Sequence, residues 1–182
     1  EACNLIDKNL QNNTYKVNFT GGEPLVQHES VNELAKYIKS KGILTYLESS
    51  CFDSQKFSYV LPSIDFVKIE FKTKDSEMVD TKHYTDLIKN TLECLDASIK
   101  MKKITYIKIV VSSKTELDNL KTLSEQIFKI ASRETISGFI IQPTYGISEP
   151  SLEKLLEFYD LVYPYYRDVR VIPQLQKIID VP

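Results

Sequence analysis

Short apolar runs alternate with segments of helical periodicity along nearly the whole chain of 182 residues. The predicted strands cover residues 15–19, 43–47, 64–71, 104–111, 139–141 and 169–172. The predicted helices cover residues 1–12, 30–41, 54–61, 82–97, 114–132 and 151–163. Strands separated by helices of roughly 10–15 residues form βαβ units, which build a parallel sheet with right-handed crossovers. The sequence therefore predicts an α/β fold.

The connections between these segments are short, and no stretch of the chain is of low complexity. A chain of this length is long enough to bury a substantial core. We therefore expect one domain that covers residues 1–182.

Polar residues collect where the predicted strands end. Because the carboxyl ends of parallel strands meet at one edge of a sheet, ligands of α/β folds and barrels bind there. The residue types at these ends are those of a binding site: carboxylates, hydroxyls, an ammonium and an amide. In chain order the segments are Thr20-Gly21-Gly22-Glu23, Glu48-Ser49-Ser50, Glu70-Phe71-Lys72-Thr73, Ser112-Ser113 and Gln142-Pro143-Thr144.

The first of these ends has the most unusual composition. Gly21 and Gly22 have no Cβ, so their backbone can turn sharply and allow a ligand to come close. Pro24 fixes its own φ and thereby stiffens the turn that follows Glu23. A carboxylate held beside exposed peptide groups suits the ammonium group of an amino-acid-like ligand.

This first segment, Thr20-Gly21-Gly22-Glu23-Pro24-Leu25, resembles the motif with which radical S-adenosylmethionine (SAM) enzymes hold the methionyl amino group. Residues 46–50 and 64–72 are similar to further segments of the organic radical-activating enzymes of that superfamily. The resemblance implies a partial (β/α)6 TIM-like barrel that lacks its first strand. It also implies that Glu48 or Ser49 lies beside the ligand, that Lys72 pairs with the SAM carboxylate, and that Glu70, Ser112 and Gln142 line the same rim.

Near the end of the chain, residues 139–143 and 173–177 look like the 7-carboxy-7-deazaguanine synthase branch, which serves 7-deazapurine biosynthesis. Gln176 stands where that branch commonly has a histidine. The alternative branch contains the activases of glycyl-radical enzymes, such as pyruvate formate-lyase activating enzyme. No single residue separates the two branches.

The resemblance also implies the chemistry. In such enzymes a reduced [4Fe–4S] cluster cleaves SAM to methionine and a 5′-deoxyadenosyl radical, which takes a hydrogen atom from the substrate. The substrate would be a 6-carboxytetrahydropterin-like molecule, or a backbone glycine of a glycyl-radical enzyme in the activase branch. Ferredoxin or flavodoxin would supply the electron, and the cytoplasm is the expected location.

The cysteines do not fit the cluster that this chemistry needs. Cys3, Cys51 and Cys94 form no CxxxCxxC pattern, and iron–sulfur clusters need thiolate ligands. We expect an N-terminally truncated fragment without the cluster loop, without a metal site and without activity of its own. A naturally cluster-less module that binds SAM or a partner is the alternative. No catalytic residue is assigned.

A Schiff-base lyase is a competing hypothesis from another class, because a lysine at a strand end, such as Lys72, can become nucleophilic. Other partners are excluded by composition. A formal net charge of -2 and a pI near 5.8 argue against a nucleic-acid surface. The chain contains no apolar run of ~20 residues and no signal-peptide pattern, so we expect no membrane contact.

Overall fold

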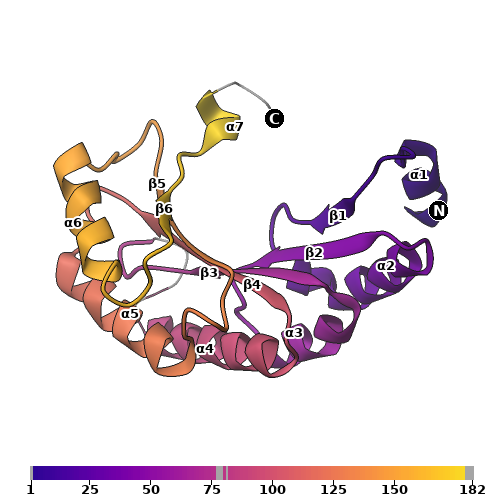
Figure 1. The fold of residues 1–182 in the computed structure, drawn as a ribbon, viewed down its shortest axis with the longest axis horizontal. Helices are drawn as coiled ribbons and strands as arrows, with labels where there is room; N and C mark the ends of the chain where they lie inside the picture. Colours follow the sequence, from indigo (N-terminus) through magenta and orange to yellow (C-terminus); the bar gives the residue numbers. More distant parts are fainter. Residues whose placement is uncertain (1, 77–79, 81, 179–182) are drawn as a thin grey trace.

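The computed structural model describes residues 2–76, 80 and 82–178. Its centre is one six-stranded sheet in which every neighbouring pair is parallel and the strands follow chain order (Figure 1). The predicted α/β fold with a parallel sheet is therefore confirmed. The strands are β1 (Lys16–Phe19), β2 (Leu44–Ser49), β3 (Phe66–Phe71), β4 (Ile104–Val111), β5 (Gly138–Pro143) and β6 (Val169–Val171).

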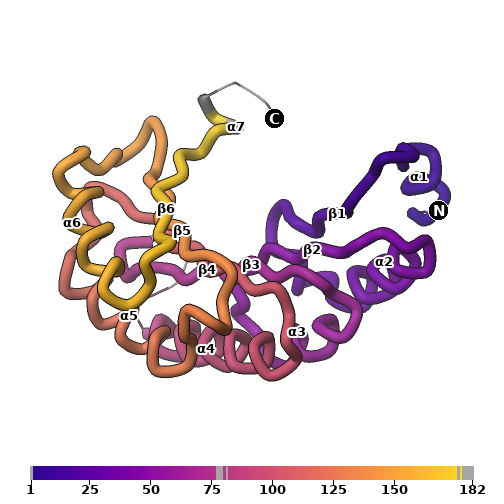
Figure 2. Tube along the Cα trace, in the orientation of Figure 1, coloured from indigo at the N-terminus to yellow at the C-terminus, as the bar shows by residue number. Residues whose placement is uncertain are grey.

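The helices follow the predicted positions to within a few residues, and α2 to α6 lie along one face of the curved sheet (Figure 1). The opposite face is left uncovered by helices α2 to α6, and the chain passes along the sheet from indigo to yellow without turning back (Figure 2). The helices are α1 (Ala2–Asn9), α2 (His28–Ser40), α3 (Ser54–Val60), α4 (Tyr84–Lys100), α5 (Leu117–Ile130), α6 (Leu152–Val162) and α7 (Leu175–Ile178).

The core lies between the sheet and this helical layer. The strands place alternate residues on opposite faces, and the residues that face the helices are apolar and fully buried. Burying each such side chain is worth roughly 1.5–3 kcal/mol. The central members are Leu47, Val67, Ile69, Ile107, Ile109, Phe139 and Ile141.

Local signals explain where several helices begin and end. The Asp53 side chain accepts hydrogen bonds from the amides of Gln55 and Lys56 at the start of α3, and Ser151 caps α6 through the amide of Lys154. Gly42 follows α2 with a φ of +75°, as expected for a helix C-terminal glycine. In the described part of the chain, no helix is both long and apolar enough to cross a bilayer.

Two differences from the sequence prediction matter for the site. β2 extends to Ser49 and β5 to Pro143, so Glu48 and Gln142 lie within strands rather than after them. Alternation then puts Glu48, Glu70 and Gln142 on the uncovered face of the sheet. Three short elements were not predicted, namely α7, a 3-10 helix at Leu61–Ser63 and a 3-10 helix at Pro24–Gln27 that begins directly after Glu23.

Candidate functional site

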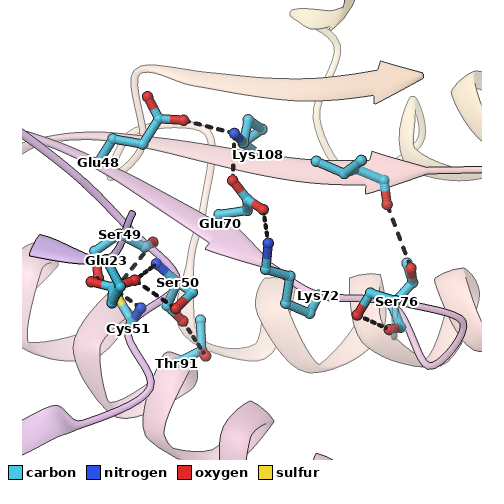
Figure 3. Close-up of polar contacts among 12 residues, drawn as sticks. Glu23, Glu48, Ser49, Ser50, Cys51, Glu70, Lys72, Ser76, Thr91 and Lys108 are labelled. Carbon is cyan, nitrogen blue, oxygen red and sulfur yellow. Dashed lines mark hydrogen bonds and ion pairs between the residues drawn. The ribbon is translucent and has the colours of Figure 1, made fainter. Parts of the chain in front are cut away.

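The carboxylate of Glu23 joins the turn after β1 to the end of β2 (Figure 3). Its Oε1 accepts from Ser49 Oγ at 2.7 Å and from the Leu25 amide at 3.1 Å. Its Oε2 accepts from the amide and the hydroxyl group of Ser50, at 2.9 Å and 2.7 Å. An ionised carboxylate has about four acceptor sites, so these four hydrogen bonds saturate it. We call Glu23, Ser49 and Ser50 the carboxylate knot.

The knot leaves the preceding glycines open. Gly21 and Gly22 have φ values of +86° and +56°, which glycine adopts at little cost, and both are exposed. A Cβ at either position would meet nothing within 4 Å. The backbone at this turn therefore borders free space that a ligand can enter.

The knot is supported from the helical side. The Cys51 amide donates to Ser49 Oγ at 2.9 Å, and the Thr91 hydroxyl group donates to the Ser50 carbonyl at 3.2 Å. Cys51 and Cys94 are both buried and free, and burial raises the pKa of the Cys51 thiol. These two thiols are packed as core side chains rather than presented to a ligand.

A second group of charged side chains crosses the uncovered face of the sheet. Lys68 Nζ lies 2.6 Å from Glu48 Oε2, and Lys108 Nζ lies 2.7 Å from Glu48 Oε1. Lys108 also pairs with Glu70, whose other oxygen pairs with Lys72 (Figure 3). We call these five residues from β2, β3 and β4, including the position just after β3, the charge ladder.

The ladder keeps its members ionised. Burial would raise the pKa of Glu48 and of Glu70, but the neighbouring lysines outweigh it and hold both pKa values below the ordinary 4.5. Burial would lower the pKa of Lys108, whose side chain is 8% exposed, but Glu70 and Glu48 outweigh it and raise that pKa. Three cations and two anions leave one positive charge in excess, and Lys72 is the terminal cation.

The Lys72 end of the ladder opens into a pocket of about 470 Å³ at the carboxyl ends of β3, β4 and β5. We call it the strand-end pocket. Four of the residues predicted from the sequence line it, namely Glu70, Lys72, Ser112 and Gln142. The other six, namely Gly21, Gly22, Glu23, Pro24, Glu48 and Ser49, are outside its lining and belong to the knot, its turn or the ladder.

Sequence reasoning missed three residues of this pocket. Of the three, Lys108 is the one that the sequence could have indicated, because it places a charge in the middle of an otherwise apolar strand. Asp75 was not assigned to the site, but its Oδ2 accepts from Ser112 Oγ at 2.7 Å and from Thr115 Oγ1 at 2.9 Å. Gln174 lines the pocket from the segment before α7. The side chain of Gln176 lies outside the described part of the structure.

Elsewhere in the described structure there is less sign of a functional site. A pocket of about 570 Å³ lies between α4 and α5 on the helical side and contains none of the predicted site residues. Within residues 2–76, 80 and 82–178, no three His, Cys, Asp or Glu side chains come together in a way that could hold a metal ion. His28 packs edge to face against Tyr59, with ring centroids 5.5 Å apart.

No protein-family model matches the chain. In sequence it is similar to the 7-carboxy-7-deazaguanine synthase of Methanocaldococcus jannaschii, with 29% identity over 181 residues that cover 98% of this chain and 72% of the relative. In fold it is similar to a domain of pyruvate-formate lyase-activating enzyme from Bacteroides vulgatus, with a TM-score of 0.67, 19% identity and coverage of 87% of this chain and 98% of that domain.

A radical SAM methyltransferase from Sphaerobacter thermophilus superposes on 99% of this chain and 57% of its own, with a TM-score of 0.72 and 11% identity. The last two similarities concern the fold alone, since their sequence identities are low. They agree with the architecture that the Gly-Gly-Glu-Pro resemblance implies. The chain is thus a homologue of the 7-carboxy-7-deazaguanine synthases and has the fold of the radical SAM enzymes.

Proposed function

We propose that this chain forms the SAM-binding and substrate-binding part of a radical SAM enzyme of the 7-carboxy-7-deazaguanine synthase type. The observation that carries the proposal is the turn at Gly21 and Gly22, which Glu23 ties to β2 while its backbone borders open space. The similarity to a synthase over 98% of the chain supports the same assignment.

The structure modifies the role that the motif implies for Glu23. Because protein donors saturate its carboxylate, Glu23 acts as a positioning residue that sets the shape of the turn. The ammonium group of SAM would then be held by peptide carbonyls of residues 20–22, with Glu23 adding its negative charge from behind. The open space beside the glycines fits a ligand that approaches the backbone closely.

Lys72 would hold the SAM carboxylate. Its ammonium group has three donors, and within the described residues it pairs with Glu70 alone. The excess positive charge of the ladder favours an anion at this end. Glu70 and Lys108 hold Lys72 at the mouth of the strand-end pocket, so the ammonium needs little reorganisation when a carboxylate binds.

When bound beside a reduced [4Fe–4S] cluster, SAM would supply a 5′-deoxyadenosyl radical. No residue of the described chain is assigned to the cluster, since no three His, Cys, Asp or Glu side chains among those residues come together as metal ligands. The work of this chain's own residues is to orient SAM and to hold the substrate in the strand-end pocket. The proposal includes 6-carboxytetrahydropterin as substrate, ferredoxin or flavodoxin as electron donor, and a cytoplasmic location.

A glycyl-radical enzyme activase is the second candidate function, favoured by the fold of the Bacteroides vulgatus domain. There the substrate would be a glycine of a partner protein rather than a small molecule. Formation of 5′-deoxyadenosine that requires 6-carboxytetrahydropterin would support the synthase, and formation that requires a glycyl-radical enzyme would support the activase.

The test of the SAM site is calorimetric titration of SAM into a longer form of the protein that carries the expected cluster loop, reconstituted anaerobically with iron and sulfide. Lys72→Ala should weaken SAM binding by roughly tenfold or more, because a charged hydrogen bond is worth roughly 1.5–3 kcal/mol. The matched control is Lys74→Ala, which removes an exposed lysine two residues away and should bind SAM like the wild type. Equal SAM affinity of Lys72→Ala and wild type would remove the main support for this site.

A further inference from the structure

The strand-end pocket contains unused hydrogen-bond capacity of one chemical kind. Three buried side-chain polar atoms in the described part of the structure have no hydrogen-bond partner: Asp75 Oδ1, Gln174 Oε1 and Ser124 Oγ. The first two belong to residues that line this pocket, although they lie far apart in the sequence. Buried polar atoms are rarely left unpaired in native proteins, because each costs about 1–3 kcal/mol.

Asp75 is held in place by its other oxygen. Ser112 Oγ and Thr115 Oγ1, from the segment after β4, both donate to Asp75 Oδ2. Ser112 Oγ in turn accepts from the Lys114 amide at 3.0 Å, which fixes the hydroxyl group as a donor to Asp75. The carboxylate is thus anchored at Oδ2, and Oδ1 is the position at which a further donor is missing.

Asp75 is also an acceptor without donor capacity of its own. Burial raises the pKa of this carboxyl group, but hydrogen bonds from Ser112, Thr73 and Thr115 outweigh it and hold the pKa below the ordinary 3.8. At neutral pH the group is ionised and can only accept. It therefore discriminates between an N–H and a carbonyl on a ligand, because a carbonyl placed against it would leave two acceptors facing each other.

The other residues that line the strand-end pocket indicate which kind of ligand suits it. Lys72, Lys108 and Lys177 bring positive charge to the same pocket, and Gln142 adds an amide. A ligand that satisfies all of these groups is an anion that also carries N–H donors on another edge. A volume of about 470 Å³ is suited to a small fused ring.

We propose that Asp75 determines ligand specificity in the strand-end pocket by accepting an N–H of a nitrogen heterocycle that carries a carboxylate elsewhere, with Gln174 as a second acceptor. This inference deepens the proposed function and rests on its small-molecule substrate. It assigns the recognition of the heterocycle to residues outside the Gly-Gly-Glu-Pro turn and outside Lys72.

The test compares two probes that share a carboxylate and a pteridine ring but differ at ring positions 1 and 2. 6-Carboxypterin has an amino group at position 2 and an acceptor nitrogen at N1, whereas lumazine-6-carboxylate has a carbonyl at position 2 and an N–H at N1. Binding of each to the full chain at pH 7 is measured by quenching of the probe's own fluorescence, without SAM. The wild type should prefer 6-carboxypterin.

Asp75→Asn is the informative variant. Its carbonyl oxygen can still accept from Ser112 and Thr115, which keeps the anchor, but its NH₂ replaces Oδ1 with a donor. Affinity for 6-carboxypterin should fall by about tenfold to a hundredfold, with little loss for lumazine-6-carboxylate. Gln174→Met should lower the same preference less. Asp80→Asn, which removes an exposed charge from the same connection, is the matched control and should behave as the wild type.

The inference is overturned if Asp75→Asn retains the wild-type preference, if it loses both probes equally, or if the wild type binds neither. Failure of the SAM titration with intact, Asp75-dependent probe binding would instead contradict only the SAM assignment. Circular dichroism of each variant confirms that a change in binding is not a loss of fold.

Discussion

The carboxylate knot and the strand-end pocket lie at the same edge of the parallel sheet, the knot after β1 and β2 and the pocket after β3, β4 and β5, yet their polar atoms are paired to different degrees. In the knot every acceptor site of Glu23 is filled by the protein. In the pocket, Asp75 and Gln174 each keep a buried oxygen without a partner in the described structure. We expect a saturated polar group to belong to the scaffold and an unsaturated one to mark a place where a ligand contributes.

The charge ladder contains both fully paired and partly paired charged groups. Its two carboxylates, Glu48 and Glu70, each have two lysine partners, whereas the ammonium group of Lys72 at the pocket end has a single carboxylate oxygen. Variants of the knot, the ladder and the glycine turn test whether saturation separates scaffold from binding site.

Glu23→Ala should have the largest effect on folding. It removes the acceptor of four hydrogen bonds and leaves the hydroxyl groups of Ser49 and Ser50 and two amides without it. We expect a loss of about 3 kcal/mol in the free energy of unfolding, since each bond to a charged group is worth roughly 1.5–3 kcal/mol and such losses are not additive. Urea denaturation measures it, with exposed Glu29→Ala as the control. A cost below that of the control would mean that the knot is not scaffold.

Lys108→Met should come next. Met keeps the apolar stem but removes the central cation, leaving Glu48 with Lys68 and Glu70 with Lys72. Because each carboxylate retains one partner, we expect about 2 kcal/mol, less than the 3–5 kcal/mol for an orphaned buried charge. The control is Lys100→Met, on a surface pair whose lysine side chain is 73% exposed. A more stable Lys108→Met protein would show that the ladder is kept for the ligand rather than for folding.

Gly22→Ala should separate binding from stability at the turn. The added methyl group meets no atom within 4 Å, so the cost is the positive φ alone, about 1 kcal/mol. The same methyl group would occupy the space assigned to SAM, so SAM affinity should fall by more than this stability change implies. Thermal unfolding and SAM titration on the same preparation give the two numbers. Unchanged SAM affinity would place the ligand elsewhere.

The smallest expected effect is on the pH dependence of stability. Glu48 and Glu70 have folded-state pKa values below their ordinary 4.5, so their contribution is complete above pH 4.5 and is lost as the pH falls through the folded values. Lys108→Met removes the lysine that lowers both, so stability should fall less steeply between neutral and acidic pH in this variant than in the wild type. Urea midpoints at a series of pH values measure the slopes. Parallel slopes would argue against the ladder as their cause.

The alternation of apolar runs was enough to predict the sheet, because period-two and helical patterns are local properties of the sequence. The rim of polar strand ends was predicted for the same reason. The separation of that rim into a carboxylate knot and a strand-end pocket was not predicted. The contact between Glu48 and Lys108 joins residues 60 positions apart, and the knot joins Glu23 to residues 26 and 27 positions away. No spacing rule shows such pairs, so Lys108 and Asp75 were missed and the hydrogen bonds that Ser49 and Ser50 donate to Glu23 were not predicted.

The order of the strands has a consequence for how the chain reaches this structure. Each strand of the sheet pairs with the next one along the chain, and the pairing never skips a strand. Loop closure for each addition therefore spans a single helix and its connections, which keeps its entropic cost low. The sheet can grow in one direction during synthesis, with the glycine turn and the knot completed before the residues of β4 and β5 leave the ribosome. The glycine turn and the carboxylate knot are then in place before the strand-end pocket forms.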